Sequence, residues 1–414
     1  MIGRTAKYFC KGFNKMKLAI LSTGFVPIPA VRGGEVERLT EYFILGNEVT
    51  HKYDIDLYTI DDELLNNKHY KYTRLIRIPN NQNNIFERVY YGLKNRLFRL
   101  LGNEDFFYYG ASQIIKKYKT NYYDKVLIEN SMDLYLQLLP KIKNEKLYFH
   151  LHNDFNDNDL GKTNKKTKRV LQTCTKFFVV SNFLKEKLRK LDPTLINKVN
   201  VIYNGIISNN FKKLSKEERM IERSKYNIKK EDKVFTYIGT VSSPKGPDKI
   251  IKALKYFIDY SNIKVLIVGS LTYDNDDIND YVSEIRKEAK KYPDKVIFTG
   301  YIKNQELNKI YSISDCVIVP TQIEETFGVV ALEAITMGIP VIASVSGGLT
   351  EVLNKNCALF VNRDKFYVKN LSNAMFKILK NPKLCESMEV GGKKQLEKFP
   401  KNIRGYYDEL ADNL

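Results

Sequence analysis

The 414-residue sequence lacks the features that mark membrane-spanning proteins, secreted proteins and proteins stabilised by structural metal ions. It contains no run of about eighteen apolar residues, which a membrane-spanning helix requires, and no apolar segment typical of a secretory leader. Its five cysteines are scattered and never occur in Cys-x-x-Cys spacing. We therefore expect free thiols in a reducing compartment, no structural metal site and no membrane-spanning segment. Cys174 and Cys316 lie in short apolar runs, where buried thiols are expected.

Composition indicates a globular protein with an anionic partner. Hydrophobic residues make up 43% of the chain, which is enough to pack ordinary cores, and the length predicts two domains. The net charge is +19, and about +13 of it lies in residues 1–210. Nucleic acid, an anionic membrane surface and a phosphate-bearing substrate would each satisfy this charge. Because no basic low-complexity tail or nucleic-acid-binding module occurs, we expect no nucleic-acid partner.

Short apolar runs alternate with helical patterns in both halves of the chain. Leu18–Leu21 and Val265–Val268 are typical of buried parallel strands, and each is followed by an amphipathic segment. Two such series predict an α/β protein with two doubly wound, Rossmann-like domains. We expect the following division of the chain: a first domain at 1–206 with a basic extension at 1–15, a second at 207–395, and a C-terminal helix at 396–414 that returns to the first domain.

The most informative stretch is Pro320–Ala334. It follows a predicted strand, Cys316–Val319, and becomes helical from Gly328. Glu325 then lies in the strand-to-helix loop, and Glu333 lies on the helix. Backbone amides at such a helix start are free donors that suit phosphate; here they belong to Phe327, Gly328 and Val329. Two carboxylates beside an anion site indicate a ligand with both phosphates and hydroxyl groups, which a nucleotide sugar supplies.

This stretch resembles the paired-glutamate signature of family-4 retaining glycosyltransferases of the GT-B fold. Glu325 and Glu333 have seven residues between them, as in that signature, and Gly338–Ala343, Gly347-Gly348 and Glu351 continue the resemblance. It covers essentially residues 16–410. The resemblance implies that Glu325 holds hydroxyls of the donor sugar near the reacting carbon, and that Glu333 holds the ribose hydroxyls.

Two further elements resemble the same family, and one position departs from it. Gly33-Gly34 stands between a strand and a helix, where glycine lets the backbone approach a phosphate. Lys245, at the start of a helix, matches the lysine that contacts the donor phosphates. At Thr240 many members carry an arginine, so one of the two usual cations is missing here. Arg32 and Arg38 are the candidates to replace it from across the cleft.

A histidine element follows the strand at 147–149. The resemblance places His152 where the family's histidine approaches the donor sugar, and His150 is the alternative. We expect the two histidines to point to opposite faces and therefore not to bind one metal together. Asp157-Asn158-Asp159 offers the Asp-x-Asp of metal-dependent glycosyltransferases, but it follows no clear strand and is interpreted as a solvated loop. We therefore expect no metal site.

Residues 86–101 mix basic and apolar side chains at helical spacing. The basic residues are Arg88, Lys94, Arg96 and Arg99. We expect a helix whose apolar face packs on the core and whose basic face meets solvent. The alternative is a helix that lies on an anionic membrane or docks a lipid-linked acceptor.

Together these features predict a retaining, metal-independent hexosyltransferase without a cofactor. The expected donor is a nucleoside-diphosphate sugar, with UDP as the nucleotide, and the expected acceptor is a glycan or lipid-linked molecule of surface polysaccharide, capsule or glycolipid synthesis. The alternatives are a sugar-nucleotide epimerase of the same fold, a basic nucleic-acid- or membrane-binding protein, and a non-catalytic membrane-associated partner subunit. The expected location is the cytoplasm or the inner face of the cell membrane.

Overall fold

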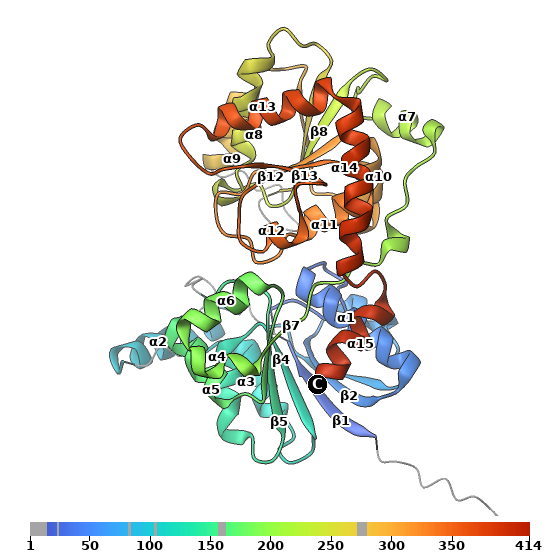
Figure 1. Ribbon diagram of the computed structural model, residues 1–414. Helices are drawn as coiled ribbons and strands as arrows, with labels where there is room; N and C mark the ends of the chain where they lie inside the picture. Colours follow the sequence, from blue (N-terminus) through green and yellow to red (C-terminus); the bar gives the residue numbers. More distant parts are fainter. Residues whose placement is uncertain (1–14, 23–24, 82–83, 103–105, 156–162, 271–279) are drawn as a thin grey trace, which may run out of the picture.

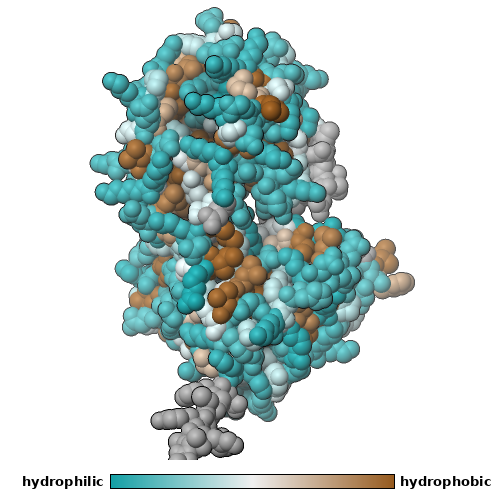
Figure 2. Space-filling model, turned by 90° about the vertical axis from the view of Figure 1, so that its right-hand side faces the viewer, coloured by the Kyte–Doolittle hydropathy of each residue, from teal (hydrophilic) through white to brown (hydrophobic). Residues whose placement is uncertain are grey.

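The chain forms two lobes, each built around a parallel β-sheet (Figure 1). This computed structural model describes residues 15–22, 25–81, 84–102, 106–155, 163–270 and 280–414. Residues 1–14 of the basic extension and Asp157-Asn158-Asp159 lie outside the described residues. A space-filling view shows a largely hydrophilic face that narrows between the lobes, with hydrophobic side chains gathered on the lower lobe beside the constriction (Figure 2).

The first lobe contains a seven-stranded sheet in the order β3-β2-β1-β4-β5-β6-β7. All neighbouring strands are parallel, which suits their nearly continuous apolar runs. The strands are β1 Met16–Leu21, β2 Tyr53–Ile60, β3 Thr73–Ile78, β4 Lys125–Glu129, β5 Lys146–Leu151, β6 Lys176–Val179 and β7 Val199–Val201. The helices are α1 Glu35–Thr50, α2 Ile85–Leu100, α3 Tyr109–Lys117, α4 Met132–Leu138, α5 Asn164–Thr173 and α6 Asn182–Leu191.

The second lobe contains a six-stranded parallel sheet in the order β10-β9-β8-β11-β12-β13. The strands are β8 Lys233–Ile238, β9 Ile263–Val268, β10 Val296–Gly300, β11 Cys316–Val319, β12 Val341–Ser344 and β13 Ala358–Val361. The helices are α7 Lys216–Ser224, α8 Pro247–Ala253, α9 Asp280–Ala289, α10 Leu307–Ile313, α11 Val329–Thr336, α12 Leu349–Val352, α13 Tyr367–Lys380 and α14 Pro382–Gln395.

Both sheets are doubly wound, as the alternation of strands and helices predicted. The strand order reverses between β1 and β4 in the first lobe and between β8 and β11 in the second. In such sheets ligands bind outside the carboxyl ends of the strands at these reversal points. The predicted α/β, GT-B architecture is confirmed, and it directs attention to the loops that follow β1, β8 and β11.

The end of the chain packs into the first lobe. Helix α14 runs from the upper lobe toward the lower one, and α15 (Ile403–Asn413) lies beside α1 (Figure 1). The Tyr407 ring packs against Phe43 in a tilted arrangement, at a ring-centroid distance of 5.2 Å. A Cβ added at Gly46 of α1 would lie 2.3 Å from Tyr407 Cβ, so this close packing requires glycine there. The chain therefore crosses between the lobes twice.

Helix α2 departs from expectation. Asn95 is its one buried residue, whereas its large apolar side chains face solvent. The prediction that this helix turns its apolar face to the core is therefore wrong. The buried thiols predicted at Cys174 and Cys316 are confirmed. Within the described part of the chain, no helix has both the length and the apolar character needed to cross a membrane.

Candidate active site

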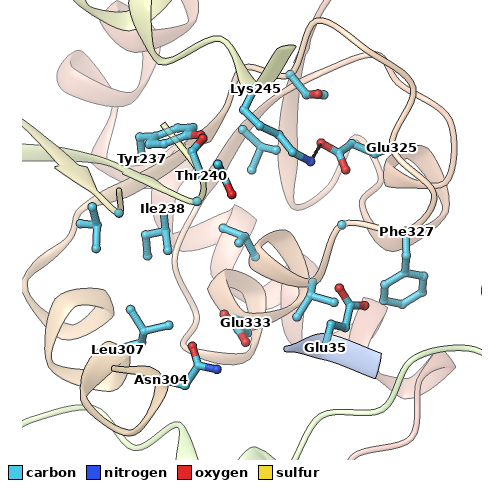
Figure 3. Close-up of a pocket in the computed structure, with 18 of the residues that line it drawn as sticks. Glu35, Tyr237, Ile238, Thr240, Lys245, Asn304, Leu307, Glu325, Phe327 and Glu333 are labelled. Carbon is cyan, nitrogen blue, oxygen red and sulfur yellow. Dashed lines mark hydrogen bonds and ion pairs between the residues drawn. The ribbon is translucent and has the colours of Figure 1, made fainter. Parts of the chain in front are cut away.

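A cavity of about 400 Å³ lies between the lobes. The second lobe lines it with the ends of β8, β9 and β11 and with the start of α11, and the first lobe lines it with the start of α1. The first-lobe residues are Gly34, Glu35, Arg38 and Asn153. Figure 3 shows carboxylates and Lys245 pointing into this space from different segments. The position at the carboxyl ends of the strands is the one that the sheet topology predicts.

Two helices begin at the cavity with glycine in place of a capping side chain. Gly34 precedes α1 with φ 98°, and Gly328 precedes α11 with φ 107°. Both values lie in a region that side chains disfavour, and a Cβ at Gly328 would come within 2.6 Å of Leu349 Cδ1. The first amides of a helix have no partner inside the helix. Two positive helix ends therefore meet at one cavity, which favours an anionic ligand.

Lys245 and Glu325 form an ion pair inside the second lobe. The Lys245 Nζ atom lies 2.8 Å from Glu325 Oε1 (Figure 3). The loop that carries Glu325 is held in place because its amide donates to Ser346 Oγ and its carbonyl accepts from Gly348 N, each at 2.8 Å. The lysine and the glutamate predicted for the donor site therefore lie together. A ligand with both phosphate and hydroxyl groups can separate this pair, with the phosphate binding Lys245 and a hydroxyl group binding Glu325.

Glu333 is buried and is held from both lobes. Its Oε1 lies 3.4 Å from Arg38 Nη1 of α1, and its Oε2 accepts a hydrogen bond of 2.8 Å from Tyr311 OH. Burial raises the pKa of Glu333, and the Arg38 guanidinium opposes this rise. Arg38 thus crosses the cleft, whereas Arg32 pairs with Asp62 at 2.8 Å. Of the two arginines considered as replacements, Arg38 is the one that reaches the site.

Glu35 is a member of the site that the sequence analysis missed. It is the first residue of α1 and accepts a hydrogen bond from Asn204 Nδ2. Burial raises its pKa from 4.5 to about 7, Arg38 lowers it, and the neighbouring Glu333 and Glu325 raise it further. Its position directly after Gly33-Gly34 was the available signal. Asn153, adjacent to His152, was missed in the same way.

His152 lies beside the cavity but is buried and bonded inward. Its Nε2 is 2.9 Å from Glu129 Oε2, and His150 Nδ1 is 3.2 Å from the same oxygen. The two imidazole centroids are 4.0 Å apart, so the expectation that the histidines point to opposite faces is wrong. Residues two apart on a strand share a face. Glu129 has its pKa lowered to about 2, because the neighbouring imidazoles outweigh the effect of burial.

The Glu129, His150 and His152 cluster also bears on metal binding. Among the described residues, these three offer ligand atoms within 4.8 Å of one another, which is close enough to hold a metal ion. All three side chains are buried. One carboxylate and two imidazoles are ligands that zinc and iron accept. The sequence reasoning that kept the two histidines apart did not foresee this cluster.

The remaining predicted residues divide by role. Thr240 and Val329 line the cavity, and the carbonyl of Thr240 accepts a 2.6 Å hydrogen bond from Tyr237 OH. Phe327 is buried, and its ring packs against Phe399 at a centroid distance of 5.7 Å. At Phe327 it is therefore the backbone that can serve a ligand. Gly33 lies in the loop before α1. A Cβ added at Gly33 would lie 3.9 Å from Tyr301 OH on the other side of the cleft.

The lobes are also joined by a carboxylate outside the cavity. Glu351 of α12 accepts hydrogen bonds from the amides of Asn182 at 2.8 Å and Phe183 at 2.6 Å, and from Tyr203 OH at 3.0 Å. These two amides are the first of α6 in the other lobe, so Glu351 satisfies donors that the helix itself leaves open. We call this contact the Glu351 latch.

Comparison with known proteins identifies the second lobe. The sequence model of the family described as glycosyl transferases group 1 matches residues 218–395. Residues 218–395 belong to this family. The glycosyltransferase match includes Lys245, Glu325 and Glu333, and so covers the second-lobe side of the cavity.

Relatives extend the similarity toward the first lobe. YtcC of Bacillus subtilis, a protein named as a glycosyltransferase, is 24% identical over 396 residues, which are 92% of this chain and 88% of the relative. The lipopolysaccharide 1,2-N-acetylglucosaminetransferase of Salmonella typhimurium is 31% identical over 232 residues, 55% of this chain and 56% of the relative. The chain thus spans little more than half the length of the second relative.

Solved structures agree with the fold. A glycosyltransferase from Rickettsia africae superposes with a TM-score of 0.71 at 19% identity, over 97% of this chain and 100% of the other. Anabaena HepE, solved in complex with UDP and glucose, has a TM-score of 0.71 at 17% identity, over 96% and 98% of the two chains. At such identities the likeness establishes the GT-B fold alone.

Proposed function

We propose that this protein is a retaining, metal-independent hexosyltransferase. It transfers a sugar from a nucleoside-diphosphate sugar, with UDP as the nucleotide, to a glycan or lipid-linked acceptor of surface polysaccharide, capsule or glycolipid synthesis. The observation that carries the proposal is the cavity where the α1 and α11 N-termini meet Lys245, Glu325 and Glu333. The HepE complex with UDP and glucose and the name of the Salmonella relative support the donor and pathway class.

Donor binding would divide the Lys245–Glu325 pair. The diphosphate would bind to the Lys245 ammonium and to the first amides of α11, because both groups donate hydrogen bonds to an anion. Glu325 would then accept hydrogen bonds from sugar hydroxyls. Glu333, fixed by Arg38 and Tyr311, would hold the ribose hydroxyls. Each carboxylate thus serves hydroxyl groups while the cation and helix ends serve phosphate.

Catalysis would come from stabilising the leaving diphosphate. Negative charge develops on that group as the sugar departs, and preorganised donors and cations stabilise it most strongly where water is excluded. In this proposal the acceptor hydroxyl attacks from the face that the leaving group occupies, and the departing phosphate takes its proton. Lys245 and Arg38 supply the positive charge that a metal ion supplies elsewhere. Closure of the two lobes would exclude water.

The test is release of nucleoside diphosphate from a panel of sugar nucleotides, with EDTA present, together with analysis of the sugar product. We expect release from one donor, retained configuration in the transferred sugar, and a fall of about a hundredfold or more in Glu325→Ala. Glu386→Gln, an exposed carboxylate on α14, is the matched control and should behave as wild type. Conversion of the donor to an epimer without release would overturn the proposal.

EDTA also tests the metal assignment. If the Glu129, His150 and His152 cluster held a metal that the reaction needs, chelation would abolish release from the donor. We expect chelation to leave the rate unchanged. Loss of activity that zinc or iron restores would show that the metal-independent part of the proposal is wrong.

A further inference from the structure

Helix α2 presents an apolar stripe to solvent. Ile85, Val89, Leu93 and Leu97 recur at four-residue spacing, which places them on one face of a helix. Neighbouring positions widen the stripe, with Phe86, Tyr90, Leu100 and Leu101. All eight side chains are between 56% and 80% exposed. A contiguous exposed apolar surface of this kind on a globular protein marks an interaction site.

The opposite face of α2 attaches the helix to the first lobe. Asn95 Nδ2 donates to the Phe107 carbonyl at 2.8 Å, and the Phe107 amide donates to Asn95 Oδ1 at 2.7 Å. The Phe98 ring packs on Phe107 at a centroid distance of 4.6 Å. The helix is therefore held with its apolar stripe outward, and it projects from the lower lobe at the left of Figure 1.

Basic side chains border the stripe. At 100° per residue, Arg88 and Arg99 fall along one edge and Lys94 along the other, and Arg96 lies just inside the first edge, between Ile85 and Val89. The three arginines are exposed and form no ion pair with any described residue. An apolar face with a cationic border fits the boundary between the headgroups and acyl chains of an anionic bilayer. A symmetric dimer through this face would bring identical arginines together, which disfavours a second copy as the occupant.

Aromatic rings continue from α2 toward the cleft. Phe106, which adjoins Phe107 beneath α2, stacks on Tyr108 at 6.2 Å between centroids, and Tyr108 stacks on Phe25 at 4.6 Å. Phe25 is half exposed and lies in the loop between β1 and α1, whose far end carries Gly33-Gly34. Phe25 thus links the aromatic residues beside α2 to the chain segment that ends at Gly33-Gly34.

We propose that α2 docks the first lobe on an anionic membrane surface and that the acceptor is reached from that membrane as a lipid-linked molecule. The docking stands on the geometry of α2 alone, whereas the acceptor class rests on the proposed transferase function. The apolar stripe enters the headgroup region, and the arginines meet lipid phosphates. The aromatic run Phe106–Tyr108–Phe25 lies beside the docked helix, and its exposed ends, Phe106 and Phe25, are the side chains that the acceptor can contact.

The docking is tested by co-sedimentation of the full chain with vesicles of phosphatidylcholine alone or mixed with phosphatidylglycerol. We expect binding to the anionic vesicles that weakens at high salt, and at least about a tenfold loss of affinity in Leu93→Glu/Leu97→Glu. Val390→Glu, an exposed apolar position on α14 of the other lobe, is the matched control and should bind as wild type. The exposed positions of all three substitutions permit folding, which circular dichroism checks.

Two results would overturn the docking. One is equal binding of wild type and the double variant to anionic vesicles, and the other is a wild-type dimer that is lost in the double variant. Donor release in solution separates this proposal from the transferase function. The double variant should release nucleoside diphosphate as wild type does without acceptor, yet lose transfer to lipid-linked acceptor in anionic vesicles. Equal transfer by both proteins would show that the acceptor is not reached through α2.

Discussion

The two sides of the cavity are built differently. The second-lobe side comes from loops whose residues follow one another in short motifs, with Lys245 near β8 and Glu325 and Glu333 around α11. The first-lobe side is assembled from distant segments, with Glu35 and Arg38 on α1, Asn153 after β5 and Asn204 after β7. The family match likewise covers the second lobe and leaves the whole of the first outside it.

The difference shows how charge is balanced in the site. On the second-lobe side a cation and an anion pair within the same lobe, as Lys245 does with Glu325. Glu333 instead takes its cation, Arg38, from the first lobe. Glu35 adds a further carboxylate whose pKa is raised to about 7. The second lobe thus supplies most of the residues that would contact the ligand. The charge of Glu333 is compensated only when the first lobe brings Arg38 close to it.

The largest expected effect comes from removing the second-lobe cation. In Lys245→Met the leaving diphosphate loses an ammonium group, and Glu325 loses its 2.8 Å partner. We expect kcat/KM for the donor to fall by about a hundredfold or more. Steady-state kinetics with wild type and with Lys255→Met, an exposed lysine of the same lobe, measure this effect. A fall in kcat/KM of less than about threefold would show that Lys245 does not contact the donor phosphates.

The first-lobe carboxylate should produce a pH-dependent stability effect. Because the pKa of Glu35 is raised to about 7 in the folded chain from its ordinary 4.5, the folded state favours the protonated form. Its contribution to stability is therefore present below pH 4.5 and is lost as pH rises to about 7. Glu35→Gln removes this loss and can still accept the hydrogen bond from Asn204.

We expect Glu35→Gln to raise the free energy of unfolding by about 1–2 kcal/mol at pH 8 and to leave it unchanged near pH 4.5. The effect is smaller than full burial would give, because the carboxyl keeps contact with the cavity. Urea denaturation of both proteins at the two pH values measures the difference. Equal stabilisation at both pH values would mean that the effect does not come from titration of Glu35.

The sequence predicted the second-lobe side better for a physical reason. Glu325, Glu333 and the start of α11 belong to one strand-loop-helix unit, so their spacing fixes their relative positions. Glu35 and Asn204 lie far apart in the chain and meet only through the packing of the first sheet. No local pattern reports such a contact. Arg38 could be proposed as a candidate, but its choice over Arg32 depended on the ion pair that Arg32 forms with Asp62.

Two failures have simpler causes. His150 and His152 were expected on opposite faces, although a two-residue spacing on a strand places them on one face beside Glu129. Helix α2 was correctly predicted as amphipathic, and its bounds shifted by one residue. Its orientation was not predictable, because hydrophobic periodicity identifies a face without showing whether protein or another surface covers it.

The smallest expected effect concerns how firmly the two sides of the cavity are held together. The Glu351 latch spans the lobes, and α12 adjoins the Glu325 loop, since Gly348 N donates to the Glu325 carbonyl at 2.8 Å. Glu351→Gln keeps the shape but replaces a carboxylate that serves the α6 amides with a neutral amide. We expect the donor KM to rise about two- to fivefold with kcat little changed, because interactions of a charge with a helix terminus contribute about 0.3–1 kcal/mol.

The distance between labels placed on the two lobes separates a latch from a purely local cap. If Glu351 holds the lobes, Glu351→Gln broadens the distribution of that distance and donor narrows it again, whereas Glu397→Gln, an exposed carboxylate just after α14, leaves it unchanged. If Glu351 acts only as a cap on α6, the distance stays as in wild type while the thermal stability falls. An unchanged distance together with an unchanged KM would mean that the hydrogen bonds of Glu351 do not hold the two sides of the cavity together, and that other contacts such as Arg38–Glu333 and Tyr203–Phe327 do.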